Sequence, residues 1–270
     1  MRLISYHLGD GRPRCGRWEG EAVLELEGGI RAVLAGDPAQ AVVVAERAFA
    51  EVTLLPAVPD PGKIACIGRN YREHAEEQNV EAPARPLVFS KFATALVAHT
   101  EPIVLSPLTE EPDWEAELAV VIGRRCKDVA AGDALSVVGG YTIMNDVSAR
   151  DLQRSDGQWT RAKGLDTFAP LGPSVVTADE IPDPHALQVR CFVSGELMQD
   201  AGTGLMIHRV PELISYLSAA FTLEPGDLIA TGTPAGVGAF RDPPRFLRPG
   251  DRVRIEISGL GTLENPVVAG

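Results

Sequence analysis

The stretch EPDWEAELAVVIGR (residues 111–124) reads as a buried apolar strand that contains two glutamates. Side chains alternate between the two faces of a strand, so Glu115 and Glu117 point to one side and Leu118, Val120 and Ile122 to the other. Two carboxylates that lie close together and partly buried repel each other and lose hydration. Either one of them takes up a proton, or a cation lies between them.

A third acid favours the cation. The segment GGYTIMND (residues 139–146) is a predicted strand that ends in Asp146, and functional groups are commonly placed where a strand gives way to a loop. Three carboxylates, with no cysteine or histidine at ligand spacing, suit a hard ion such as Mg²⁺, with Mn²⁺ or Ca²⁺ as substitutes. The alternative is a solvated polar face on an edge strand, with Asp146 in a turn.

Composition limits the other possibilities. The chain has 270 residues, 45% of them hydrophobic and 23% charged, which allows one large domain or two unequal ones. A net charge of −12 argues against a partner such as nucleic acid, which needs a basic surface. No stretch approaches the roughly 18 apolar residues of a membrane span, and no signal-peptide core follows Met1, so we expect a cytoplasmic protein without a membrane partner. The four cysteines are far apart and support neither a zinc site nor a redox motif.

The chain divides near residue 60. The first 55 or so residues alternate short apolar segments with Gly and Asp turns, and LLPAVPDPGK (residues 54–63) resists both helix and central strand. We therefore expect a small β-rich N-terminal domain over residues 1–58 and a larger domain, which carries the three acids, over residues 59–270. The second part is mostly strand-like, with one clear amphipathic helix in VPELISYLSAAF (residues 210–221). The predicted fold class is α+β, mainly β.

Five ordered motifs resemble the fumarylacetoacetate hydrolase family, which includes acylpyruvate hydrolases and homoprotocatechuate-pathway isomerase/decarboxylases. They are CIGRNYREHAEE (66–77), DWEAELAVVIGR (113–124), GYTIMNDVSARDLQ (140–153), GQWTRAKGLDTFAPLGP (157–173) and LIATGTPAGVG (228–238). The resemblance covers residues 63–268. It implies a mixed, rolled β-sheet, a divalent metal that is usually Mg²⁺, and usually a homodimer.

The resemblance also implies which residues bind the metal. They are Glu115, Glu117 and Asp146, the trio that the charge argument selects. Larger eukaryotic members carry a fourth carboxylate seven residues before the histidine of the first motif, where this chain has Ile67. We therefore expect three carboxylates, completed by water or substrate.

His74 and Glu77 lie three residues apart in YREHAEEQ (residues 71–78), so one or two helical turns would place both on one face. A carboxylate beside an imidazole orients it and raises its basicity, which is how water is deprotonated near neutral pH. The alternative is a solvated surface helix. The resemblance implies a water-activating pair on a lid over the substrate.

Further site residues follow from the resemblance. It implies that Lys163 lies near the metal and stabilises an enolate. It implies substrate contacts from Arg69, Tyr71, Arg150, Gln153 and Thr233. From the sequence alone, Lys163, Arg150 and Gln153 could instead be surface residues, and Thr233 could lie in a plain glycine turn.

The expected reaction is a metal-dependent hydrolysis of a C–C bond in a 2,4-dioxo acid, of the acylpyruvate or fumarylpyruvate type, which releases pyruvate and a carboxylic acid. In this scheme the His74–Glu77 pair activates water, and Lys163 with the metal stabilises the pyruvate enolate that leaves. An alternative is an isomerase or decarboxylase of an unsaturated 2-hydroxy or 2-oxo dicarboxylic acid in aromatic catabolism. A third possibility is a non-catalytic 2-oxo acid binding protein.

Overall fold

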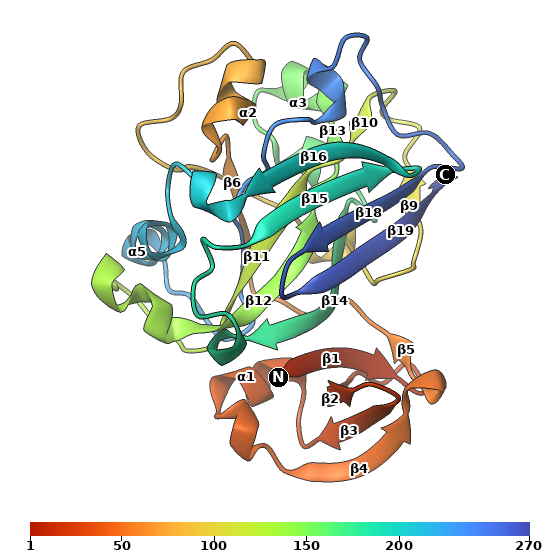
Figure 1. The fold of residues 1–270 in the computed structure, drawn as a ribbon, viewed down its shortest axis with the longest axis vertical. Coiled ribbons are helices and arrows are strands. Elements are labelled where there is room, and N and C mark those ends of the chain that lie inside the picture. Colours follow the sequence, from red (N-terminus) through yellow and green to blue (C-terminus); the bar gives the residue numbers. More distant parts are fainter.

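A twelve-stranded mixed sheet runs through the chain in the computed structural model, which describes residues 1–270 (Figure 1). Its order is β4-β3-β2-β1-β14-β12-β11-β17-β6-β7, with β5 on β1 and β8 on β14. The strands are β1 (Arg2–His7), β2 (Arg14–Glu19), β3 (Ala22–Leu26), β4 (Val43–Ala48), β5 (Thr53–Leu54), β6 (Ile64–Gly68), β7 (Leu87–Ser90), β8 (Leu96–Val97), β11 (Ala116–Ile122), β12 (Val138–Asn145), β14 (Ala169–Thr177) and β17 (Leu228–Ala230). Two pairs are parallel, β17 with β6 and β14 with β8. The predicted mixed sheet is confirmed.

A second sheet of five strands packs in front of β11 and β12 in Figure 1, in the order β16-β15-β18-β19-β9. Its strands are β9 (Ile103–Leu105), β15 (Gln188–Val193), β16 (Glu196–Gly202), β18 (Arg252–Ile257) and β19 (Gly261–Ala269). The inner faces of the two sheets share one hydrophobic core, in which Leu118 and Val120 of β11 belong to the same cluster as Val189 and Ile255. This shared core fixes the position of β11.

The α-helices are few and short, which agrees with the prediction that the chain is mostly strand. They are α1 (Ile30–Ala35), α2 (Arg72–Glu77), α3 (Arg150–Asp156), α4 (Thr160–Lys163) and α5 (Val210–Ala220), and a two-stranded sheet pairs β10 (Pro112–Asp113) with β13 (Ser148–Ala149). The predicted helix over residues 210–221 is confirmed as α5, whose buried face includes Val210, Leu213, Ile214 and Leu217. None of these helices is long and apolar enough to cross a membrane.

The N-terminal strands form a lobe of their own in Figure 1, yet they continue the large sheet. β1 pairs antiparallel with β14, where Leu3 lies opposite Val175. The short β-rich unit predicted before residue 58 is therefore joined to the rest of the chain by strand pairing as well as by the segment after β5 (Thr53–Leu54).

β11 is a central strand, with β12 on one side and β17 on the other, and all seven of its residues are buried. Alternate side chains enter different hydrophobic clusters: Leu118 and Val120 enter one, Ala119 and Val121 the other. This alternation places Glu117 on the side of Ala119, opposite Leu118. The alternative of a solvated edge strand is therefore wrong, and the glutamates are carried into the interior.

Candidate metal centre and active site

Strand pairing brings the three predicted acids together. β11 and β12 run antiparallel with Ala116 opposite Asn145, so the start of β11 lies beside the end of β12. The backbone N–H of Asp146 donates to the carbonyl of Glu115 at 2.9 Å. One carboxylate oxygen from each of Glu115, Glu117 and Asp146 lies within 4.8 Å of the others, and all three residues are buried. This arrangement could hold a divalent cation.

Glu115 has two cationic neighbours. Lys163 Nζ donates to its Oε2 at 2.6 Å, and a guanidinium nitrogen of Arg150 lies 2.7 Å from its Oε1. Burial by itself raises the pKa of Glu115, but Lys163 and Arg150 outweigh this effect and lower the pKa to about 2. Glu115 is therefore ionised even when no metal is bound.

Glu117 forms no ion pair, and the charge of the nearby Lys163 offsets its burial only in part. Its Oε2 accepts one hydrogen bond, from the backbone N–H of Gly232 at 2.8 Å. Burial, followed by the nearby carboxylates of Asp146 and Glu115, raises the pKa of Glu117 well above its usual range. The buried cluster holds four carboxylates (Asp113, Glu115, Glu117, Asp146) and three cationic side chains (Lys91, Arg150, Lys163). A hard cation on oxygen ligands would supply the positive charge that Glu117 lacks, so the residues present fit such an ion.

Lys163 lies at the predicted place, and its ammonium bridges two acids. It donates to Glu115 at 2.6 Å and to Asp146 Oδ2 at 2.9 Å, and it lies over the ring of Phe89. Burial alone would lower the pKa of this lysine, but Asp146 and Glu115 outweigh burial and raise it. The ammonium therefore stays charged and can stabilise negative charge on a substrate oxygen.

Sequence reasoning missed Lys91. This side chain is fully buried, and its Nζ donates to Asp146 Oδ1 at 2.6 Å and to the carbonyl of Val147 at 3.1 Å. Lysine is rarely fully buried unless it is paired. The available signal was weak: Lys91 lies in the strand-like segment PLVFSKF (residues 86–92) and directly follows β7 in the structure.

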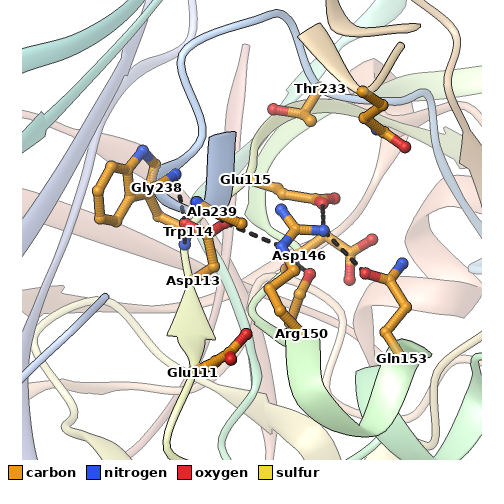
Figure 2. Close-up of polar contacts among 12 residues, drawn as sticks. Glu111, Asp113, Trp114, Glu115, Asp146, Arg150, Gln153, Thr233, Gly238 and Ala239 are labelled. Carbon is orange, nitrogen blue, oxygen red and sulfur yellow. Dashed lines mark hydrogen bonds and ion pairs between the residues drawn. The ribbon is translucent and has the colours of Figure 1, made fainter. Parts of the chain in front are cut away.

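Arg150 is held by Asp113, which sequence reasoning also missed (Figure 2). Asp113 accepts from Arg150 Nε at 2.9 Å and from the backbone N–H groups of Gly238 at 2.7 Å and Ala239 at 3.0 Å. Position 238 must be glycine, because an added Cβ would lie 1.9 Å from a backbone carbonyl oxygen. Arg150 also donates to Gln153 Oε1 at 3.0 Å, and its second terminal nitrogen is buried without a partner. That nitrogen is a free donor at the site.

His74 and Glu77 form the predicted pair on α2. His74 Nδ1 lies 2.6 Å from Glu77 Oε1, and Glu77 Oε2 accepts from the backbone N–H of Gly236 at 3.0 Å. His74 is buried, with only 3% of its surface exposed, so the alternative of a solvated surface helix is wrong for this side chain. The other ring nitrogen of His74 lies 2.8 Å from the amide nitrogen of Gln78, a contact that the sequence did not predict.

Most of the predicted site residues line one small cavity, while Asp146 and Glu77 lie behind its lining. Its lining includes the predicted residues Arg69, His74, Glu115, Glu117, Arg150, Gln153, Lys163 and Thr233, together with Ile67, Gly68, Gln78, Phe89 and Trp159. Arg69 lies over the ring of Trp159, and Thr233 donates to the carbonyl of Ala116 at 3.0 Å. The structure does not bring Tyr71 to the cavity, because its ring is buried in the main hydrophobic core.

Comparison with known proteins shows the family of this chain. Residues 63–268 match the family model described as fumarylacetoacetate (FAA) hydrolase C-terminal. Mitochondrial oxaloacetate tautomerase FAHD2B of Bos taurus is 52% identical over 220 residues, which cover 81% of this chain and 70% of the relative. Among solved structures, 2-hydroxyhepta-2,4-diene-1,7-dioate isomerase from Mycobacterium marinum has a TM-score of 0.83 and 42% identity, covering 100% of this chain and 98% of the other. Maleylpyruvate hydrolase from Sphingobium sp. SYK-6 has a TM-score of 0.78 and 33% identity, with 100% of both chains covered. The chain therefore belongs to the fumarylacetoacetate hydrolase family, whose similar members here are a tautomerase, an isomerase and a hydrolase.

Proposed function

We propose that this protein is a Mg²⁺-dependent tautomerase of a 2-oxo dicarboxylic acid of the oxaloacetate type, interconverting its enol and keto forms. The observation that carries the proposal is the contact of the Lys163 ammonium with two of the three buried carboxylates, at 2.6 and 2.9 Å. Such a cluster is suited to an enolate, the species that lies between the two tautomers. The oxaloacetate tautomerase from Bos taurus, 52% identical to this chain, supports the choice of substrate.

Glu115, Glu117 and Asp146 would hold the metal. A bound divalent cation supplies positive charge that stabilises an enolate oxygen. Mg²⁺ is the ion we propose, because all three protein ligands are carboxylate oxygens.

Arg150 and Gln153 would bind and orient the substrate. The unpartnered terminal nitrogen of Arg150 is a buried donor, and the amide nitrogen of Gln153 is free because its oxygen accepts from Arg150. Both side chains line the cavity. A carboxylate next to the 2-oxo group can accept from both, which would place the 2-oxygen near Lys163.

His74 would move the proton at C3. Glu77 accepts from Nδ1, so Nε2 is the nitrogen that exchanges protons with a substrate. In the keto-to-enol direction one proton leaves C3 for Nε2, while Lys163 stabilises the charge that develops on the 2-oxygen. That oxygen takes a proton from solvent as the product leaves, and Nε2 releases the C3 proton to solvent, so substrate and product have the same composition. This reaction is closest to the isomerase alternative raised by the sequence.

The test follows the enol absorbance of oxaloacetate in buffer with Mg²⁺. We expect the protein to accelerate enol–keto conversion well above a protein-free Mg²⁺ blank. Since acid–base and electrostatic groups typically contribute about 10²- to 10⁴-fold, Lys163→Met should lose at least about 10² of this acceleration. Conversion at the blank rate by the wild-type protein would refute the proposal.

Hydrolysis of a 2,4-dioxo acid is the second candidate, and the short His74–Glu77 contact of 2.6 Å favours it. In that reaction Nε2 would take a proton from water. The hydroxyl would bond to the distal carbonyl carbon, and the C–C bond would break to release the pyruvate enolate and a carboxylic acid. Release of pyruvate from acetopyruvate, with His74→Ala as control, separates this candidate from tautomerisation, which releases no second product.

A further inference from the structure

A chain of four side chains runs from Glu77 to Arg69 and fixes the state of His74. Arg69 Nε donates to Gln78 Oε1 at 3.0 Å, and a guanidinium has only donors, so the amide oxygen of Gln78 must face it. The amide nitrogen then faces His74 Nε2 at 2.8 Å. Because an amide nitrogen donates, Nε2 is the acceptor, and the imidazole hydrogen lies on Nδ1 and is donated to Glu77. The nitrogen that would take a proton from substrate is therefore covered by Gln78.

Arg69 is the cavity cation without an anionic partner. Lys163 and Arg150 each contact carboxylates, whereas Arg69 has the ring of Trp159 at 5.6 Å and the neutral amide of Gln78. Its backbone has φ of 56°, a left-handed conformation that is costly for any residue except glycine. Such conformations persist where the surrounding structure enforces them, commonly at functional sites. The guanidinium therefore lies at the cavity with its charge unpaired.

We propose that Arg69 and Gln78 form a latch that keeps Nε2 of His74 covered until a substrate with a second, distal carboxylate binds. This inference rests on the proposed function and names the feature of the substrate that the site requires. A distal carboxylate is a stronger acceptor for Arg69 than a neutral amide oxygen, because both partners are charged. When Arg69 turns to the carboxylate, Gln78 loses its anchor and its amide leaves Nε2. Gln78 is accordingly a positioning residue that acts through His74.

Substrate pairs test the latch. The kcat/KM for oxaloacetate is compared with that for its C4 monomethyl ester, which keeps the 2-oxo acid and lacks the distal charge, with Mg²⁺ present. Gln78→Met has a side chain of similar length without an amide hydrogen. Since one hydrogen bond of this kind is worth about a factor of ten, we expect the ester to react about tenfold faster with this variant and the preference for oxaloacetate to shrink accordingly. An unchanged preference in folded Gln78→Met would overturn the latch.

Two further variants separate the parts of the latch. Gln78→Glu can accept from Arg69 but, as a carboxylate, cannot donate to Nε2, so it should also reduce the preference and raise KM for oxaloacetate by pairing with Arg69. Gln153→Met makes the same substitution at the other cavity glutamine, which contacts Arg150. It should change KM for both substrates alike. A loss of preference in Gln153→Met equal to that in Gln78→Met would contradict a specific role for Gln78.

A readout without substrate keeps the latch testable if the proposed function fails. ¹⁵N NMR of histidine-labelled protein, with the His74 signals assigned among the five histidines by His74→Gln, reports which ring nitrogen carries hydrogen. We expect a protonated Nδ1 and a hydrogen-bonded, unprotonated Nε2, with Gln78→Met shifting the Nε2 signal. A protonated Nε2, or an Nε2 signal that does not move in Gln78→Met, would refute the latch. Failure of the wild-type protein to accelerate oxaloacetate tautomerisation would instead refute the proposed function.

Discussion

Replacing Glu115 or Glu117 by glutamine should have very different effects on stability, although Glu115 directly precedes β11 and Glu117 is the second residue of that strand. Without metal, Glu115 is ionised and contacts Lys163 and Arg150. Removing one partner of a buried ion pair costs about 3–5 kcal/mol, and because Asp146 still contacts Lys163 we expect about 3 kcal/mol for Glu115→Gln. At about 2–4 °C per kcal/mol for a chain of this size class, Tm should fall by roughly 6–12 °C.

Glu117→Gln should leave the metal-free protein almost unchanged, within about 1 kcal/mol. Burial and the nearby carboxylates of Asp146 and Glu115 raise the pKa of Glu117 and so favour its neutral acid, which has nearly the same shape as glutamine. This variant should instead lose most of the stabilisation that Mg²⁺ binding gives the wild-type protein. At a Mg²⁺ concentration of 100 times Kd, the wild-type protein gains about 2.7 kcal/mol, and Glu117→Gln should gain much less.

The assay is denaturant unfolding at neutral pH, first in EDTA and then with increasing Mg²⁺. Glu110→Gln is the control, because Glu110 is exposed and its side chain has no ion pair. Equal losses of metal-free stability in the Glu115 and Glu117 variants would contradict the different roles given to these residues. A full Mg²⁺ response in Glu117→Gln would contradict a role for Glu117 as a metal ligand.

Three further substitutions test the residues that support the site. Lys91→Met removes the ammonium that orients Asp146 and should lower Mg²⁺ affinity or kcat by about 10- to 100-fold, measured by calorimetry and enol decay. Asp113→Asn removes the charge that pairs with Arg150 and should destabilise the protein by about 3 kcal/mol in denaturant unfolding. It should also raise KM for the substrate, and an unchanged KM would contradict the role given to Arg150. Gly236→Ala would place a Cβ 2.1 Å from a backbone carbonyl oxygen, at a backbone φ of 104°. This variant should therefore have a lower Tm and a lower kcat. A wild-type kcat would show that the hydrogen bond from the Gly236 N–H to Glu77 is dispensable.

The parts of the site that could be predicted from the sequence are local in the chain. Glu115 and Glu117 share a face because a strand repeats every two residues, and His74 meets Glu77 because a helix brings residues three apart together. Asp146 could be added because it lies at the end of the next strong strand of the sequence, which in the structure is β12 (Val138–Asn145) and pairs with β11. These predictions needed only the periodicity of regular structure.

The remaining parts depend on contacts between distant segments. Lys91 meets Asp146 across 55 positions, and a lysine that will be buried looks the same in a sequence as one that stays in solvent. Asp113 belongs to the quoted strand segment, but its task depends on Arg150 and on a glycine loop more than 100 residues away. Tyr71 shows the opposite case: it lies within a site motif, yet its ring packs into the core. The pairing of β1 with β14 could not be predicted from the sequence either, because no local sequence pattern determines it.

The most direct measurement is the exchange of the C3 hydrogens of oxaloacetate for deuterium in D₂O, followed by ¹H NMR, because exchange at C3 reports enolate formation itself. Protein stripped with EDTA should exchange at the blank rate, Mg²⁺ should restore fast exchange, and Lys163→Met with Mg²⁺ should stay close to the Mg²⁺ blank. Fast exchange by stripped protein, or by Lys163→Met at the wild-type rate, would contradict the claim that Glu115, Glu117, Asp146 and Lys163 together stabilise an enolate.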